Sequence, residues 1–219
     1  MINRQSYLEE LQQIRNYILE MSTQVEEDLS KALAALRSGD TELAEQVKQN
    51  GSKVDVMQFI IEDEAATIIA TQQPVARDLR ELVTIFKLTA NLERIGDHSI
   101  HLAKAVSKFS IEPAFRSVKH VEKMAETGLE MLHAAITAYL NRDAVEARKA
   151  ASMDDGIDTE HKALINEVLR LMKGNPKLIK KAHRLLNISN NLERLGDHIT
   201  NICEAVIYMV EGIHEELND

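Results

Sequence analysis

Cysteine and long apolar runs are almost absent from this sequence. A single cysteine, Cys203, stands among 219 residues, and one thiol excludes an intrachain disulfide framework. The longest unbroken apolar run spans residues 205–210, far short of the roughly 20 residues that a membrane-spanning helix needs. The first ten residues carry no apolar signal core. We therefore expect a cytoplasmic protein that meets a membrane only through a partner.

Positive charge is also in short supply. The chain has 26 Lys and Arg against 35 Asp and Glu, which leaves a net charge of −9. A chain of this sign is repelled by the nucleic-acid backbone. The most basic run, residues 177–184, is typical of a solvated helix face. Direct nucleic-acid binding is therefore not expected.

Proline, glycine and aromatic residues are scarce as well. Three Pro, eight Gly and no Trp leave little material for turns, and apolar residues recur every three or four positions, as in helices. Each proline, Pro74, Pro113 and Pro176, stands where a helix would begin, a position that tolerates its missing N–H. Asp143 and Asn175 are suited to capping a helix N-terminus. These features favour an all-α fold.

The breaks divide the chain into six predicted helices of bundle-like length. We place them at residues 5–37, 41–70, 74–109, 114–141, 144–172 and 176–216.

An eight-residue phrase occurs twice, as NLERIGDH at 91–98 and as NLERLGDH at 191–198. Further acids fall at equivalent places in the two halves: Asp40 and Asp143, Asp55 and Asp158, and Glu93 and Glu193. The offset changes from 103 to 100 residues, so the second half is about three residues shorter. Two tandem three-helix bundles, in residues 1–110 and 111–219, are the simplest explanation of this internal repeat.

The repeated phrase places two acids four residues apart on one helix face: Glu93 and Asp97, and then Glu193 and Asp197. At about 100° per residue, the acids of the first copy lie on the same side as apolar residues such as Leu82. Unpaired buried carboxylates are too costly to keep. A cation should therefore neutralise each pair.

Two kinds of cation fit, and the residues alone leave the choice open. Arg94, or Arg194 in the second half, could pair with the Asp three residues later, but not with the Glu, because adjacent residues point about 100° apart. A divalent or trivalent metal ion would satisfy both acids, since it prefers carboxylate oxygens. His101 lies one turn further along, with Asn201 as its counterpart, and either could ligate the ion or support a ligand.

Other members of the phrase have plainer interpretations. Gly96 and Gly196 predict close approach of a neighbouring backbone, because glycine inside a helix is otherwise unfavourable. His98 and His198 point away from the acids and are expected to be ordinary polar residues or to support a ligand by a hydrogen bond, and not to bind an ion directly. Cys203 is expected to be a small core residue.

The phrases LERIGDH, after QQPVARDLR at 72–80, and LERLGDHITNICEAVIYMVEG, at 192–212, resemble the PhoU family of phosphate-transport regulators. The resemblance extends over nearly the whole chain. It implies two three-helix bundles, iron or zinc held by paired acidic motifs, and no enzymatic activity. It also implies contact with the ATP-binding subunit of a phosphate ABC transporter and with a sensor histidine kinase.

Carried over by position, the family's motif acids are Glu93, Asp97, Glu193 and Asp197. Glu62, Asp55 and Asp158, on the preceding helices, could supply facing carboxylates. The chain departs from the family pattern at Asn91 and Asn191, where an acid is common, and at Ile165, which stands opposite Glu62. His101 replaces a usual Asn, so zinc or nickel is an alternative for the first half, and manganese or magnesium also suits carboxylates.

Two competing functions remain. A ferritin-like di-iron protein needs two Glu-x-x-His pairs, and Glu130–His133 and Glu211–His214 have that spacing. A metal-free helical scaffold would rely on Arg94 and Arg194 for all the neutralisation. We also expect a homodimer, because Leu88, Leu92 and Ile95 form a second apolar flank on the third helix.

Overall fold

The computed structural model describes residues 4–106 and 118–218, and every regular element in them is helical. The helices are α1 (Arg4–Ser38), α2 (Thr41–Gln72), α3 (Arg77–Val106), α4 (Val118–Asn141), α5 (Ala144–Ala151), α6 (Asp154–Gly174) and α7 (Ile179–Glu211), with a 3-10 turn, η1 (Pro176–Leu178), before α7. The predicted all-α fold is confirmed. None of the helices in the described ranges is long and apolar enough to cross a membrane.

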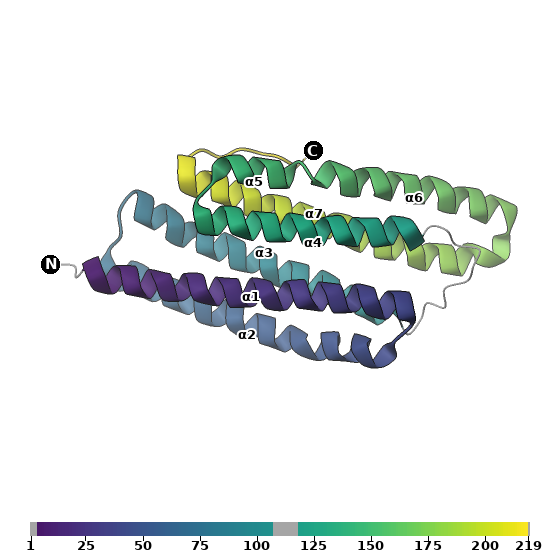
Figure 1. Ribbon diagram of the computed structural model, residues 1–219, viewed down its shortest axis with the longest axis horizontal. Coiled ribbons are helices and arrows are strands. Elements are labelled where there is room, and N and C mark those ends of the chain that lie inside the picture. The colour runs from purple at the N-terminus through teal and green to yellow at the C-terminus, as the bar shows by residue number, and fades with distance from the viewer. Residues whose placement is uncertain (1–3, 107–117, 219) are drawn as a thin grey trace.

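Two three-helix units lie side by side (Figure 1). Helices α1, α2 and α3 form the first unit. In the second unit α5 and α6 together take the place that α2 has in the first, between α4 and α7. The units meet chiefly where α3 packs along α7, and α1 also contacts α4. The phrase at 91–98 therefore lies on one central helix and the phrase at 191–198 on the other.

Most of the predicted helix boundaries hold for chemical reasons. The Asp40 side chain accepts hydrogen bonds from the backbone N–H groups of Glu42 and Leu43, and Asp143 caps α5 in the same way. Asn175 accepts from the N–H of Lys177, but it caps η1 and not a full helix. Helix α3 begins at Arg77, three residues after Pro74. The break predicted at 109–113, with Pro113, lies outside the described residues.

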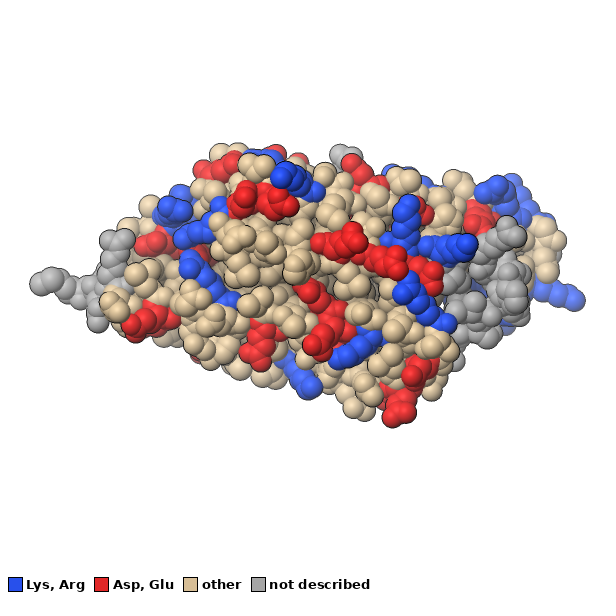
Figure 2. Space-filling model, viewed as in Figure 1, with Lys and Arg blue, Asp and Glu red and all other residues tan. Residues whose placement is uncertain are grey.

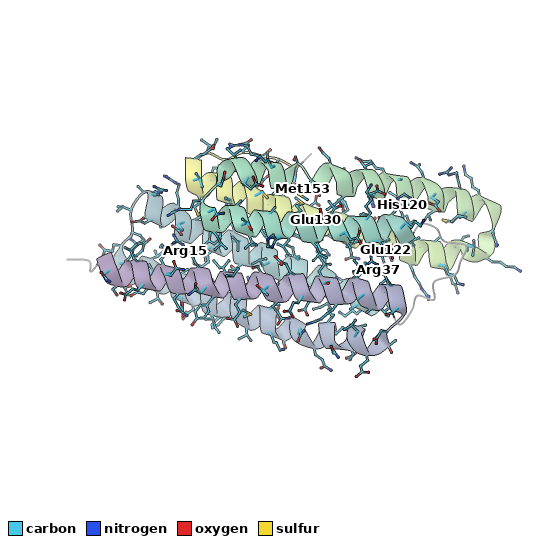
Figure 3. All side chains as sticks on the ribbon, in the orientation of Figure 1. Arg15, Arg37, His120, Glu122, Glu130 and Met153 are labelled. Atoms are coloured by element: carbon cyan, nitrogen blue, oxygen red, sulfur yellow. The ribbon has the colours of Figure 1, made fainter. Side chains whose placement is uncertain are left out.

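The predicted fifth helix, at 144–172, is broken in the structure. Helix α5 ends at Ala151, and α6 begins at Asp154 after a turn through Ser152 and Met153. Figure 3 labels Met153 at this turn. The last helix ends at Glu211, where Gly212 adopts the left-handed conformation with φ 76°. Residues 212–218 then fold back along α7, and the N–H of Leu217 donates to Glu204 at 2.7 Å.

One continuous apolar core runs through both units. Leu88, Leu92 and Ile95 are completely buried in it, so the prediction that they form a self-association surface is wrong. Cys203 is buried as expected.

Ion pairs join the two units near both ends. At one end Arg37 of α1 reaches α4, with Nε 2.9 Å from Glu122 Oε1 (Figure 3). Toward the other end, buried Glu81 of α3 is held by Arg15 of α1 and by Arg142 from the turn after α4. The pairs made by Arg37 and by Arg142 therefore link the first unit to the second.

Candidate functional site

In the first half, the acids of the phrase already have a cationic neighbour. Arg94 Nε lies 3.3 Å from Glu93 Oε2, and Nη1 lies 3.6 Å from Asp97 Oδ2. The prediction that Arg94 could not reach Glu93 is wrong, because the long side chain bends back to the preceding residue. Glu93 is 20% exposed but Asp97 is 44% exposed, so Asp97 does not lie on the apolar stripe as predicted.

The residues predicted to face these acids are only partly brought to them. Burial raises the pKa of Glu93, and the charges of Asp97 and Asp55 raise it further, while Arg94 opposes them. Asp55 therefore lies near the pair. Glu62 accepts hydrogen bonds from Gln58 at 2.8 Å and from Thr89 at 3.2 Å, one turn before Glu93 on α3.

The predicted ligands His101 and Asn201 lie elsewhere. His101 lines a groove with Lys104, Arg184 and Asn187, on the side of α3 that faces α7. Asn201 donates to Asn91 at 3.5 Å and accepts from Asn218 of the C-terminal segment at 3.2 Å. Each step of four residues rotates a helical side chain by about 40°, so His101 and Asn201 have turned away from the acids toward the partner helix.

In the second half, five carboxylates line one cavity of about 280 Å³, and one of them, Asp155, is exposed. Asp154 and Asp158 come from the first turns of α6, and Glu193 and Asp197 come from α7. Arg148 also borders this cavity, but its guanidinium is bound to Glu211 at 2.7 Å and to Glu215 at 2.6 Å. Asp158 is paired with Lys162 Nζ at 2.8 Å, whereas Asp154, Glu193 and Asp197 have no ion-pair partner among the described residues.

The electrostatics of the second cluster reflect this excess of negative charge. Burial and the charges of Asp197, Asp158 and Glu193 together raise the pKa of Asp154 to about 7, with burial the largest cause. Burial and the charge of Asp158 likewise raise the pKa of Asp197, and Arg194 only partly offsets them. Asp154 Oδ1 is buried and makes no hydrogen bond of normal geometry with the described residues, although the nearby Thr200 hydroxyl partly offsets the rise in the pKa of Asp154. A bound cation would relieve the repulsion and satisfy this oxygen.

Gly196 makes room for the second cluster. A Cβ at position 196 would collide with Asp154 Oδ1 and would lie 3.1 Å from Ile157 Cδ1. At Gly96 the nearest atom to such a Cβ is Val54 Cγ1 at 3.5 Å, an ordinary contact. Close approach was predicted at both glycines. It occurs at Gly196 through side chains of α6, where a neighbouring backbone was expected.

The histidines of the phrase join the two halves. His98 Nδ1 donates to Asn191 Oδ1 at 3.1 Å, and His198 Nδ1 donates to Asn91 Oδ1 at 2.9 Å. The two imidazole rings lie 5.5 Å apart between their centroids. Because α3 and α7 run antiparallel, the first Asn of each phrase meets the last His of the other. The repetition is thus explained in part by this reciprocal seam.

The second cluster suits a cation that prefers oxygen ligands, because its side chains are negatively charged carboxylates. These side chains do not, however, converge on one common centre. In residues 4–106 and 118–218 no three His, Cys, Asp or Glu side chains stand close enough to share one ion. The carboxylates around the cavity would have to rotate inward to do so. The orphaned Asp154 oxygen and the space at Gly196 are the observations that support a cation here.

The two Glu-x-x-His pairs of the di-iron alternative are not brought together. Glu130 and His133 lie exposed on α4, with His133 Nδ1 3.8 Å from Glu26 (Figure 3 labels Glu130). Glu211 is bound to Arg148, and His214 stacks on Tyr208 with ring centroids 4.4 Å apart. A di-iron centre needs these residues to project into one bundle core.

Comparison with known proteins identifies the family. The family model described as the PhoU domain matches twice, at residues 18–106 and 121–206. The chain belongs to the PhoU family. A PhoU homolog from Clostridium acetobutylicum, described as a phosphate-specific transport system accessory protein, is 32% identical over 219 residues and is covered completely, as is this chain. The Escherichia coli K12 accessory protein PhoU is 32% identical over 93% of this chain and 84% of its own length.

Solved PhoU structures have the same architecture. The crystal structure of PhoU from Pseudomonas aeruginosa superposes with a TM-score of 0.87 at 31% identity, covering 94% of this chain and all of that one. The phosphate transport system regulatory protein PhoU from Streptococcus pneumoniae also has a TM-score of 0.87, at 32% identity, over 96% of this chain and 99% of that one. The two PhoU-domain matches fall one in each predicted half. The domain limits at 110 and 111 stay a prediction, because they lie outside the described residues.

Asp154 is the site residue that sequence reasoning missed in this PhoU protein. Repeat equivalence guided the search, and at the offset of 103 residues Asp154 corresponds to Gly51, which has no carboxylate. The signal that could have found it is the acidic run Asp154–Asp155 with Gly156, in the middle of a predicted helix. Such a run favours a helix N-terminus, where acids are stabilised by the helix dipole.

Proposed function

We propose that this protein is an accessory regulator of a phosphate-specific transport system that acts by protein–protein contact and not by catalysis. The observation that carries the proposal is the full-length match to accessory proteins of that system, with both copies of the phrase in place. The described site residues offer paired acids and a cavity, but they do not include a nucleophile activated by an adjacent base.

The partners in this proposal are the ATP-binding subunit of the phosphate transporter and a sensor histidine kinase. Both would be met on the side of the membrane where ATP is hydrolysed, which agrees with the cytoplasmic location expected from the sequence. Phosphate status would be conveyed by which partner is bound.

Affinity capture from cells tests the regulatory proposal. The tagged protein is purified from cells grown at high and at low phosphate, and the captured proteins are identified by mass spectrometry. We expect the transporter ATP-binding subunit or a histidine kinase to be captured, in amounts that differ between the two conditions. Capture of neither partner under either condition would contradict the proposal.

We also propose that the paired acids bind metal, with the second half as the stronger site. Asp154, Asp158, Glu193 and Asp197 would hold a hard cation such as iron, manganese or magnesium, because their donors are all carboxylate oxygens. Such an ion would tie the start of α6 to α7. In the first half Arg94 occupies the place of a metal, and His101 lies too far around the helix to favour zinc or nickel there.

Metal analysis of protein purified without chelator tests this second proposal. We expect substitution of Glu193 and Asp197 by Ala to remove more bound metal than the same substitutions at Glu93 and Asp97. If both double variants retain the parent's metal content, the metal sites are assigned to the wrong residues, and the metal-free scaffold alternative gains support.

The proposed homodimer is better placed on α1 and α2 than on α3. Leu19, Val56, Phe59 and Ile60 are all exposed there, Phe59 by 71%, beside a groove of about 910 Å³. At equivalent positions the second unit carries Glu122, Thr159, Lys162 and Ala163. Since the same fold tolerates polar or small residues at these positions, the fold does not require the large apolar ones in the first unit, and a second copy could cover them.

Sedimentation analysis tests this arrangement. We expect the parent protein to dimerise and Phe59→Glu to sediment as a monomer, while the matched exposed variant Lys162→Glu leaves the dimer unchanged. A parent that is monomeric at micromolar concentration would contradict the dimer, and a dimeric Phe59→Glu would contradict its location.

A further inference from the structure

The join between α6 and α7 concentrates positive charge in an acidic protein. Between Glu167 and Glu193 the chain has six Lys and Arg residues and no acid, although its net charge is −9. The hairpin brings cations from both helices to one tip: Arg170 and Lys173 from the end of α6, Lys177 from η1 and Lys180 from the start of α7. We refer to residues 169–180 as the basic tip.

The side chains of the basic tip are accessible. Arg170, Lys173, Lys177 and Lys180 are all exposed, and none of the described carboxylates forms an ion pair with these three lysines. Figure 2 shows Lys and Arg side chains projecting at the end of the molecule where Figure 1 places the α6–α7 join. Surface lysines without partners remain available for an anionic surface.

Two large apolar residues are exposed among these cations. Leu169, in the last turns of α6, and Ile179, at the start of α7, are each 47% exposed. Neighbouring Met172 and Leu178 are instead packed against the core. An exposed apolar pair flanked by lysines, whose stems can lie along an apolar phase, is typical of surfaces that dip into a lipid headgroup layer.

The equivalent tip of the first unit shows that the fold does not require this composition. The equivalent residues of the first unit, 69–80, carry Arg77 and Arg80 with Asp78, a net charge of +1 against +4 for residues 169–180. This tip lies at the opposite end of the molecule (Figure 1). The two ends of a pseudo-symmetric protein therefore differ in charge, and only the end that bears the basic tip is suited to a negative surface.

We propose that the basic tip docks directly on an anionic lipid bilayer. A nucleic acid is a poorer fit because it offers nothing to Leu169 and Ile179 and would repel the acidic body. A bilayer accepts both the lysines and the apolar pair. The tip lies at an end of the long axis. Contact there keeps most of the acidic body farther from the bilayer than the ~10 Å over which charges interact in physiological salt.

This inference goes beyond the proposed regulatory function and replaces the sequence-based expectation that membrane contact runs only through a partner. Four exposed cations and two apolar side chains provide weak, reversible binding, because each Lys or Arg near an anionic surface contributes about a fivefold increase in partitioning. Such binding would raise the concentration of the protein at the membrane without anchoring it.

Co-sedimentation with vesicles tests the proposal with the purified full chain and no other protein. Vesicles of phosphatidylcholine alone are compared with vesicles in which one third of the lipid is phosphatidylglycerol. We expect binding to the anionic vesicles and not to the neutral ones, and loss of binding at high salt. The triple variant Lys173→Gln/Lys177→Gln/Lys180→Gln should bind on the order of 100-fold more weakly, and Ile179→Ser should bind several-fold more weakly.

The matched control removes three exposed or half-exposed lysines from α1 and α2, as Lys31→Gln/Lys48→Gln/Lys53→Gln, and so has the same net charge. We expect it to bind anionic vesicles like the parent. Circular dichroism verifies that both triple variants are folded. Equal binding by the two triple variants, equal binding to neutral and anionic vesicles, or no binding by the parent would each overturn the proposal. Capture of an acidic protein by the tip, without vesicle binding, would also overturn it.

Discussion

Asp154 lies at the start of α6 with one carboxylate oxygen buried against Gly196 and making no hydrogen bond of normal geometry with the described residues. Its pKa is raised from 3.8 to about 7, chiefly by burial. The folded state therefore holds a proton on Asp154 more tightly than the unfolded state does. The stability that this group contributes is present at low pH and is lost as pH rises toward and through 7 in the metal-free protein.

Replacing Asp154 with Asn should have opposite effects with and without metal. In chelator at pH 8 we expect Asp154→Asn to raise the free energy of unfolding by on the order of 1–3 kcal/mol, because a repelled charge is removed. With Mn²⁺ present, the variant should gain less stability from the ion than the parent does. Urea denaturation in both conditions measures the two effects. Exposed Asp63→Asn on α2, away from the cavity, is the control, and destabilisation of chelated Asp154→Asn would contradict the account.

The two glycines of the phrase provide a matched pair of variants. Gly96→Ala places a methyl group in ordinary contact, so we expect stabilisation of up to about 1 kcal/mol from the better helix propensity of Ala. Gly196→Ala should bring no such gain, because the methyl group displaces Asp154. The same variant should also be stabilised less by added Mn²⁺ than the parent is. Thermal unfolding with and without the ion measures both. Equal effects of the two substitutions would mean that the halves do not differ as described.

At the level of single residues, the sequence predicted that the acids of the phrases are costly, and the raised pKa values of Glu93, Glu193 and Asp197 agree with that expectation. It did not identify Asp154, because a search guided by repeats finds what the halves share. The sequence predicted that His101 and Asn201 lie beside the acids. Residues four apart on a helix turn by about 40° at each step, so residues two steps after the Glu no longer share its face.

At the level of helices, most boundaries could be predicted from caps and prolines, whereas the break at Ser152–Met153 has only the acidic run that follows it as a signal. Nothing in residues 144–172 is proline, and a run of Ala, Ser and Met is compatible with a continuous helix. Packing of α6 across α7 overrides that local preference, and the resulting new N-terminus brings Asp154 to the cavity. Tertiary contacts, which the sequence does not display, thus assembled the second acidic cluster.

The contact between α6 and α7 should depend on pH through His161. Its Nδ1 lies 2.7 Å from Ser189 Oγ, and burial lowers the pKa of His161 below 6.5. The unfolded state therefore binds the proton more tightly, so the stability that this group contributes is present above about pH 6.5 and is lost as pH falls below it. Urea titrations between pH 7.5 and 5, in chelator, should show a smaller loss of stability at low pH for His161→Gln than for the parent. Exposed His183→Gln should follow the parent, and a His161→Gln curve parallel to the parent's would contradict the assignment.

At the scale of the whole molecule, Arg142 holds the two units together at a conformational cost. It has a left-handed backbone with φ 55°, and at the equivalent turn of the first unit Gly39 has φ 73°. A non-glycine residue in this conformation costs about 1 kcal/mol, which the ion pair with buried Glu81 offsets. Arg142 thus explains why the second unit departs from the glycine of the first.

Arg142→Gly should destabilise the protein by about 1–3 kcal/mol, because it leaves Glu81 with Arg15 as its one remaining partner in the described structure. The substitution also removes the strain of a left-handed backbone at a non-glycine residue, which offsets part of this loss. In a Glu81→Gln background the same substitution should cost little or be stabilising. A double-mutant cycle by chemical denaturation measures the difference. An equal cost in both backgrounds would show that the ion pair is not the reason for Arg142.

The central claim is that the doubled phrase builds one seam and two unlike acidic sites, of which the second holds a cation. Crystals soaked in Mn²⁺ and measured for anomalous scattering test it directly. We expect a peak in the cavity among Asp154, Asp158, Glu193 and Asp197, and a weaker peak or none beside Glu93, where Arg94 lies. Comparable peaks in both halves, or none at millimolar Mn²⁺, would contradict the claim.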